Sequence, residues 1–170
     1  SSFAASLALQ AALQKTLNLR SWWILPLSAS PNEGCLGVFI SGRSTVMPPT
    51  AEERLFASAF VAQATFAIKH SQRDPVMEAG QQMAEAASAT LDLADVVERV
   101  LILATQLIVC DSAALFLRYG DVMRVYAVHK LPRELIGSEF DLLNPLLAKM
   151  LATRSPIYFA DVQGEDRFIH

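Results

Sequence analysis

The sequence predicts an α+β domain in which helices pack on the faces of an antiparallel sheet. Runs of strand-forming residues occur in adjacent pairs, and each pair is joined by a short turn, as in antiparallel hairpins. Between the pairs, apolar residues recur at the spacing of amphipathic helices. With 170 residues, the chain is long enough for one ordinary domain, or two partial ones, with a core of its own.

Residues 1–72 predict a helix, a strand hairpin and a closing helix. Apolar spacing indicates a helix over Ala4–Leu17, and strands are expected at Trp22–Ser28 and Cys35–Ser41, joined by the turn residues 30–34. Pro26 lacks a backbone donor, which places its strand at a sheet edge or beside a bulge. Gly37 indicates close packing against a neighbouring element.

The closing helix is expected over Thr50–His70. Thr50 followed by Glu53 three residues later forms the capping-box pattern that marks a helix start. Asp74-Pro75 interrupts the helical pattern because the residue before a proline disfavours helical geometry. Helix resumes in the alanine-rich stretch Gln81–Ala89 by the same spacing.

Residues 91–170 predict a similar set of elements that ends in an incomplete sheet. Leu93–Val109 is strongly amphipathic, and Gly120-Asp121 is the turn of a hairpin. The remaining expected elements are strands Ala113–Tyr119 and Val122–His129, short helices Pro132–Ile136 and Asn144–Thr153, and a final strand after Arg154.

Composition excludes several functional classes. The net charge of −3 argues against direct binding of nucleic acid, which requires a basic surface. No segment approaches the length of about 18 apolar residues that a membrane span needs, so a soluble cytoplasmic protein is expected. Cys35 and Cys110 have neither metal-binding nor disulfide-scaffold spacing, and we expect both to be small buried residues.

Several motifs together resemble the GAF domain, a sensor and dimerisation module of signalling proteins that is related to the PAS domain. The motifs are Asp92–Val100 leading to Cys110–Leu117, then Leu146–Asp161, then Leu19–Leu27, Leu36–Ser41 and Pro49–Glu53. Their order is inverted, because the end of such a domain precedes its beginning. The resemblance therefore implies a C-terminal half at 1–72, a linker or continuous helix at 73–90, and an N-terminal half at 91–170.

The inverted order has two explanations: a piece of a tandem array, or a permuted single domain. In both, an isolated half would expose unpaired strand edges, which promote aggregation. We therefore expect the halves to complete one another, either within one chain or by domain swapping between two chains.

A ligand pocket is expected between the sheet and the segment Pro132–Phe168. The residues proposed to line it or to contact the ligand are Trp23, Phe116, Tyr126, His129, Phe159, Arg167 and Phe168. The alternative is that these aromatic residues only fill the core. No catalytic residues, metal ligands or cofactor are expected, because the histidines and loop carboxylates lack the spacing of a triad or metal site.

The expected function is a non-enzymatic signalling sensor that binds an unknown small molecule, forms a homodimer, or does both. It would regulate an attached output domain, such as the histidine kinase of a two-component system, a nucleotide cyclase or a transcription factor. One alternative is a structural dimerisation fragment without a ligand. Another is an enzyme resembling the free methionine sulfoxide reductases, which also use the GAF fold but need several loop cysteines.

Overall fold

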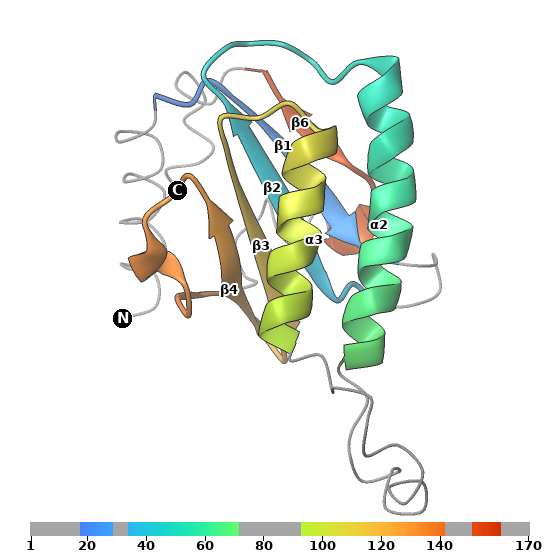
Figure 1. Cartoon of the computed structure of the whole chain (residues 1–170), viewed down its shortest axis with the longest axis vertical. Coiled ribbons are helices and arrows are strands. Elements are labelled where there is room, and N and C mark those ends of the chain that lie inside the picture. Colours follow the sequence, from blue (N-terminus) through green and yellow to red (C-terminus); the bar gives the residue numbers. More distant parts are fainter. Residues whose placement is uncertain (1–17, 29–33, 72–92, 142–150, 161–170) are drawn as a thin grey trace, which may run out of the picture.

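One antiparallel sheet carries two long helices on the same face in the computed structural model, which describes residues 18–28, 34–71, 93–141 and 151–160 (Figure 1). The α+β class and the antiparallel sheet are thereby confirmed. The elements are β1 (Ser21–Leu27), β2 (Gly37–Arg43), α2 (Ala51–Ser71), α3 (Leu93–Leu107), β3 (Ser112–Tyr119), β4 (Val122–His129), the 3₁₀ turn η2 (Arg133–Leu135), β5 (Glu139–Asp141) and β6 (Ile157–Phe159).

The six strands lie in the order β5-β4-β3-β2-β1-β6, and every neighbouring pair is antiparallel. β2 pairs with β3, where Phe39 lies opposite Leu115, and β1 pairs with β6, where Trp23 lies opposite Tyr158. Strands from residues 1–72 and 91–170 thus share one sheet within this chain. Their assignment as halves of a GAF-like domain stays a prediction, as does swapping between chains, and residues 73–90 lie outside the described residues.

The positions of Pro26 and Gly37 agree with what the sequence predicted for them. Among the described strands, β6 pairs with β1 only from Trp22 to Ile24, so Pro26 lies beyond the paired segment, at an open edge of β1. A Cβ atom on Gly37 would lie 2.1 Å from the carbonyl oxygen of Phe116, so β3 can approach β2 this closely only because residue 37 is glycine.

The main core lies between the sheet and the two helices. Phe39 is fully buried at its centre, and its ring meets Phe60 of α2 edge-on, with the centroids 5.4 Å apart. Val97 and Leu101 of α3 pack into the same cluster with Leu115 of β3. We call this side of the sheet the helix face.

A second, smaller cluster covers the opposite face of the sheet. It contains Phe116, whose ring meets Phe140 of β5 edge-on at 5.7 Å. Leu135 of η2 and Leu151 pack against it. The sheet therefore has apolar side chains on both faces, and only the helix face carries long helices among the described residues (Figure 1).

Most predicted elements occur with shifted ends. The helix predicted over Pro132–Ile136 is only the 3₁₀ turn η2, and β5 was not predicted. β2 continues past Ser41 to Arg43 because Arg43 still pairs with Ser21 of β1. The helices predicted at Ala4–Leu17 and Gln81–Ala89 lie outside the described residues, and of Asn144–Thr153 only 151–153 are described, as helix.

Candidate functional site

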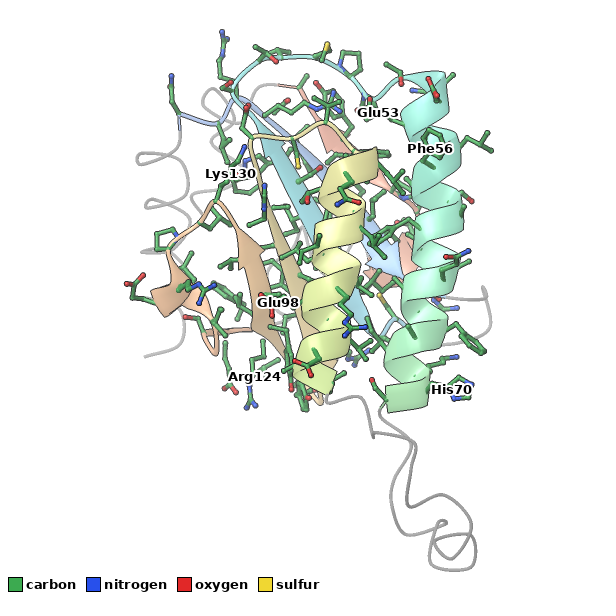
Figure 2. All side chains as sticks on the ribbon, in the orientation of Figure 1. Glu53, Phe56, His70, Glu98, Arg124 and Lys130 are labelled. Carbon is green, nitrogen blue, oxygen red and sulfur yellow. The ribbon has the colours of Figure 1, made fainter. Side chains whose placement is uncertain are left out.

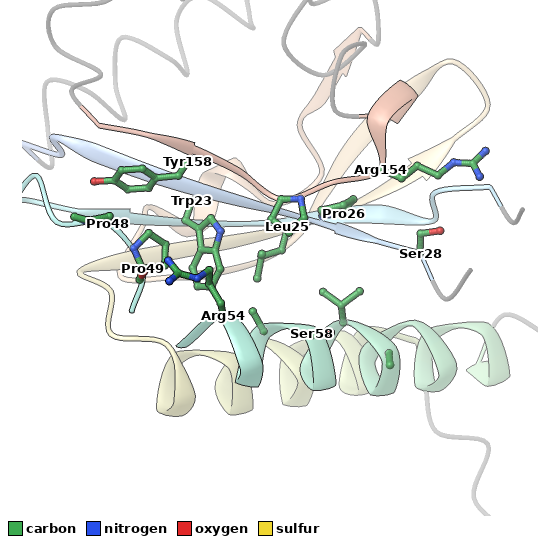
Figure 3. Close-up of a pocket in the computed structure, with 14 residues that line it drawn as sticks. Trp23, Leu25, Pro26, Ser28, Pro48, Pro49, Arg54, Ser58, Arg154 and Tyr158 are labelled. Atoms are coloured by element: carbon green, nitrogen blue, oxygen red, sulfur yellow. Dashed lines mark hydrogen bonds between the residues drawn. The ribbon is translucent and has the colours of Figure 1, made fainter. Parts of the chain in front are cut away.

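A cavity of about 540 Å³ lies between the first half of α2 and the β1–β6 edge of the sheet (Figure 3). This volume is within the range of small-molecule sites in proteins. Its described lining residues come from β1, the segment before α2, α2 itself and the segment 154–158. They are Trp23, Leu25, Pro26, Ser28, Pro48, Pro49, Arg54, Ala57, Ser58, Val61, Ala62, Arg154, Pro156 and Tyr158.

Strand pairing positions the sheet side of the cavity. Alternate residues of β1 point to the same face, so Trp23 and Leu25 both face the helices. Tyr158 lies opposite Trp23 across the β1–β6 pair and belongs to the same face. The aromatic ring of Trp23 and the phenol of Tyr158 therefore enter the cavity region together (Figure 3).

The capping box of α2 fixes the other side. The backbone N–H of Glu53 donates to Thr50 Oγ1 at 3.1 Å, and the N–H of Thr50 donates to Glu53 Oε2 at 2.9 Å. This reciprocal pair satisfies donors of the first turn within the helix itself. At the next residue, the Arg54 guanidinium donates from Nη1 to the carbonyl oxygen of Pro49, which places its cationic group beside the two prolines.

The polar side chains among the described lining residues are guanidinium groups and hydroxyls, and none of them is a carboxylate. Arg54 and Arg154 contribute positive charge, and no aspartate or glutamate is among the described residues that line the cavity. Ser28 and Ser58 add hydroxyl groups. The Tyr158 hydroxyl is a buried atom with no hydrogen-bond partner, an arrangement that costs free energy.

A buried ion pair joins the end of β2 to the start of α2 and is hydrogen-bonded to the segment after α3. Arg43 and Glu53 form this pair with side chains only 7% and 10% exposed. Arg43 Nε also donates to the Val109 carbonyl at 2.7 Å, and the Val109 N–H donates to Glu53 Oε1 at 3.3 Å. Arg43 Nη1 donates to the Met47 carbonyl at 3.2 Å. These contacts connect residues 43–47, in the segment that leads to the cavity, with the first turn of α2 and with the residue two positions after α3.

A second hydrogen-bonded contact lies next to this pair. Asp111 Oδ2 accepts from the Ser44 N–H at 2.6 Å and from Ser44 Oγ at 2.8 Å. These hydrogen bonds from Ser44 lower the pKa of the Asp111 carboxyl. The connection after β2 and the connection after α3 are therefore joined at the same end of the helix pair.

The outward sides of α2 and α3 are apolar yet exposed. Leu55 and Phe66 on α2 are 71% and 64% exposed, and Leu103 on α3 is 55% exposed. Ile102, Leu107 and Val109, on or just beyond α3, are also exposed. We call these six residues the outer helix surface.

An exposed polar cluster lies at the other end of the molecule from Glu53 (Figure 2). The rings of Tyr119 and Tyr126 stack with centroids 5.9 Å apart, and their hydroxyls are hydrogen-bonded to each other. The Arg124 guanidinium lies over the Tyr119 ring at 4.9 Å and pairs with Glu139. Burial and the hydrogen bond with Tyr126 raise the pKa of Tyr119 to about 12.

The sheet divides the residues predicted to contact a ligand. Trp23 lines the cavity, and Tyr126 packs against the helix-face cluster. Phe116 and Phe159 belong to the opposite cluster, so the structure does not bring them together with Trp23 and Tyr126.

The other predicted contacts lie elsewhere. His129 is half-buried at the end of β4, opposite Ala113 of β3, whereas Arg167 and Phe168 lie outside the described residues. From the predicted segment Pro132–Phe168, the structure instead brings Arg154, Pro156 and Tyr158 to the cavity. The ligand-binding role of all seven predicted residues stays a prediction.

Sequence reasoning missed the residues that give the cavity its polar character. Arg54 directly follows Glu53 of the capping box, so the pattern that predicted the helix start also placed a cation beside it. Tyr158 sits between Ile157 and Phe159, and alternation in a strand would have put it on the face opposite to its neighbours. The missing information was the pairing of β6 with β1.

Neither cysteine has the surroundings of a reactive thiol. Cys35 is buried and its thiol donates to the Gly37 carbonyl, while Cys110 is half-buried. Burial raises the pKa of both thiols. In the described ranges, no three His, Cys, Asp or Glu side chains gather as a metal site would require, and no helix there has the length and apolarity to cross a bilayer.

Comparisons of the chain with protein-family models, curated proteins and solved structures gave no significant match. The resemblance to GAF domains therefore rests on the residue patterns of the sequence alone.

Proposed function

We propose that the protein is a non-enzymatic, GAF-like regulatory module that binds a small molecule and forms a homodimer through α2 and α3. In the full-length protein it would control an attached output domain. The observation that carries this proposal is the outer helix surface. A large exposed apolar patch on a domain favours a protein interface.

The sequence of elements supports the GAF-like part of the proposal. Read from residue 91 and continued from His170 to Ser1, the described elements run α3, β3, β4, β5, β6, β1, β2, α2. The resemblance implies a helix, two strands, helices, a strand, a loop, a helix, two strands and a closing helix. The described elements share with that order the opening helix with its two strands and the closing hairpin with its helix. In the fold, the first and last helices of that order lie side by side on the helix face (Figure 1).

A second copy of this chain fits the outer helix surface better than an unrelated partner. α2 carries Glu52 in its first turn and Lys69 and His70 in its last turn, so its two ends have opposite charge. A two-fold contact between antiparallel copies of α2 would bring Glu52 of one copy near His70 of the other. The helix dipoles would also run antiparallel in that arrangement.

Analytical ultracentrifugation over a range of concentrations tests the dimer. We expect the wild-type chain to sediment as a dimer and Leu103→Glu to sediment as a monomer, because a carboxylate would be buried in the interface. Ile136→Glu is the matched control, since Ile136 is 47% exposed and lies outside the helix pair. A wild type that stays monomeric at every concentration, or a dimeric Leu103→Glu, would contradict the proposal.

The sensing part is tested separately by thermal melts with a panel of metabolites. A ligand that binds only the folded protein raises the unfolding midpoint, and the increase grows with the ligand concentration relative to its dissociation constant. Stabilisation by a panel member supports a sensor. No stabilisation, together with a dimer, supports the alternative of a structural dimerisation fragment, which the outer helix surface favours equally.

An enzyme of the free methionine sulfoxide reductase type receives less support. Such chemistry needs thiolates that are accessible to substrate, and the raised pKa values of Cys35 and Cys110 disfavour the thiolate. Methionine sulfoxide reduction by the wild type that is lost in a Cys35→Ala/Cys110→Ala variant would support this enzyme, and no such activity in the wild type would contradict it.

A further inference from the structure

We infer that the cavity between α2 and the β1–β6 edge binds a small amphipathic anion, with a carboxylate or phosphate head group and an apolar body. This inference rests on the proposed function, because it names the ligand class of the proposed sensor site. It combines three features of the cavity: apolar walls, positive charge without nearby carboxylates in the lining, and a buried hydroxyl without a partner.

The walls of the cavity suit an apolar body. Trp23 and Leu25 form the sheet side, while Ala57 and Val61 form the side of α2. Four prolines complete the described apolar lining: Pro26, Pro48, Pro49 and Pro156. Because proline fixes its own backbone torsion, these walls lose little conformational freedom when a ligand binds.

Arg54 is the group that would hold the head group. One of its N–H groups donates to the Pro49 carbonyl, which orients the guanidinium and leaves its other donors for a ligand. Figure 3 shows Arg54 next to Trp23 and Pro49, whereas Arg154 lies with Ser28 at the other end of the cavity. A planar guanidinium matches the two oxygens of a carboxylate or phosphate.

The capping box engages two backbone N–H groups at the start of α2, those of Thr50 and Glu53. Thr50 and Glu53 satisfy each other through the capping box, and the Glu53 carboxylate is also held by Arg43. We therefore assign the anion contact to the Arg54 side chain and not to these two N–H groups. This makes the contribution of Arg54 separable by mutation.

Tyr158 gives an independent indication of a polar ligand atom. Tyr158 lines the cavity, and its hydroxyl is buried without a hydrogen-bond partner. A ligand oxygen that reaches this hydroxyl would satisfy it and remove the cost of burying it unpaired. The phenol lies at the same end of the cavity as Trp23 and Pro48 (Figure 3).

Isothermal titration of the 170-residue chain with three probes tests the ligand class. The probes are 4-phenylbutyrate, phenyl phosphate and the uncharged 4-phenylbutanamide. We expect at least one of the two anions to bind the wild type about tenfold more tightly than the amide, as one charge-assisted hydrogen-bonded contact predicts. The preferred anion identifies the head group. Equal affinity for anions and amide, or no binding of either anion, would overturn the inference.

Two variants locate the site. Arg54→Gln should weaken anion binding about tenfold and leave amide binding unchanged, whereas Arg133→Gln, an exposed arginine of η2, should bind as the wild type does. Tyr158→Phe should also weaken anion binding, yet its thermal midpoint should equal or exceed that of the wild type, because it removes an unpaired buried hydroxyl. Anion binding that is unaffected by Arg54→Gln would place the anion elsewhere.

The outcomes separate this inference from the proposed function. If the anion binds through Arg54 but the chain stays monomeric in ultracentrifugation, the inference about the ligand class is supported and the proposed dimer is contradicted. If the chain dimerises and only uncharged members of the metabolite panel bind, the proposed module is supported and the inference about an anionic ligand is contradicted.

Discussion

The pairs Arg43–Glu53 and Arg124–Glu139 join the same residue types in opposite surroundings. The first is buried between β2, α2 and the end of α3, and the second lies on the surface with side chains 41% and 43% exposed. Glu53 lies at the N-terminal end of α2, and Arg124 lies near the other end of the helix pair (Figure 2). The two pairs therefore differ in burial, and also in the backbone carbonyls that Arg43 contacts.

Burial determines what each pair contributes. At the surface, water and salt weaken the attraction, and most such pairs add little to stability. In the interior, a charge that loses its partner remains buried and unsolvated, which costs several kcal/mol. The buried pair also fixes Met47 and Val109 through backbone hydrogen bonds, so its loss would release two connections together.

Glu53→Ala should have the largest effect and tests the buried side of this comparison. Removing the carboxylate leaves Arg43 charged and buried, and we expect the free energy of unfolding to fall by about 3–5 kcal/mol. Urea unfolding followed by circular dichroism measures it. The double variant Arg43→Met/Glu53→Leu should lose less than Glu53→Ala alone, since no unpaired charge remains. A double variant that is less stable than the single one would contradict this interpretation.

Thr50→Ala separates the helix-capping role of Glu53 from its ion pair. The variant removes the hydroxyl that accepts from the Glu53 N–H, while the Arg43–Glu53 pair remains. We expect a loss of about 1 kcal/mol in the same urea experiment. Thr105→Ala is the control, because its hydroxyl only bonds to Ile102 within α3 and alanine favours helix interiors. An equal loss in both variants would refute the capping explanation.

The exposed cluster should show its effect at high pH. Burial and the Tyr126 hydrogen bond raise the pKa of Tyr119 from 10.0 to about 12, so the folded state holds this proton more tightly than the unfolded chain does. The resulting stability is present below pH 10 and is lost as the pH rises through about 12. Stability of the wild type should therefore decline more steeply than that of Tyr119→Phe over this interval. If the urea midpoints of the wild type and of Tyr119→Phe fall in parallel with rising pH, the raised pKa of Tyr119 does not contribute to stability.

Glu139→Gln should have the smallest effect of the series. Because the Arg124–Glu139 pair is exposed, we expect no measurable change in the urea midpoint. Added salt on the order of 1 M should leave this result unchanged, and it should also leave the cost of Glu53→Ala largely intact, since buried charges are screened less. A midpoint shift for Glu139→Gln comparable to that of Thr50→Ala would remove the contrast between the two pairs.

Local signals in the sequence predicted the helices and strands, whereas the cavity is formed by strand pairing between distant parts of the chain. The capping box at Thr50 and the turn at Gly120-Asp121 located α2 and the β3–β4 hairpin, because both signals act over a few residues. The pairing of β1 with β6 joins segments with no local signal in common. The cavity depends on that pairing, which is why Arg54 and Tyr158 were not among the predicted contacts.

The face of the sheet on which each predicted aromatic contact lies also depends on strand pairing. Phe116 and Phe159 face the second cluster, whereas Trp23 faces the helices, and strand registers decide these directions. The register shift between Leu115 and Phe116 further changes how β4 residues alternate opposite β3. A bulge of this kind depends on tertiary packing and leaves no clear pattern in one sequence.

The pairing of β2 with β3 also has a consequence for the order of events during synthesis. These strands meet in the middle of the sheet, and the nearby contact between Arg43 and Val109 spans 66 residues of chain. When β2 leaves the ribosome, β3 has not yet been synthesised, so the edge of β2 that later pairs with β3 is still unpaired. Closure of this long loop, more than helix formation, should then limit the folding rate, and this unpaired edge is the segment most exposed to misassociation with other nascent chains.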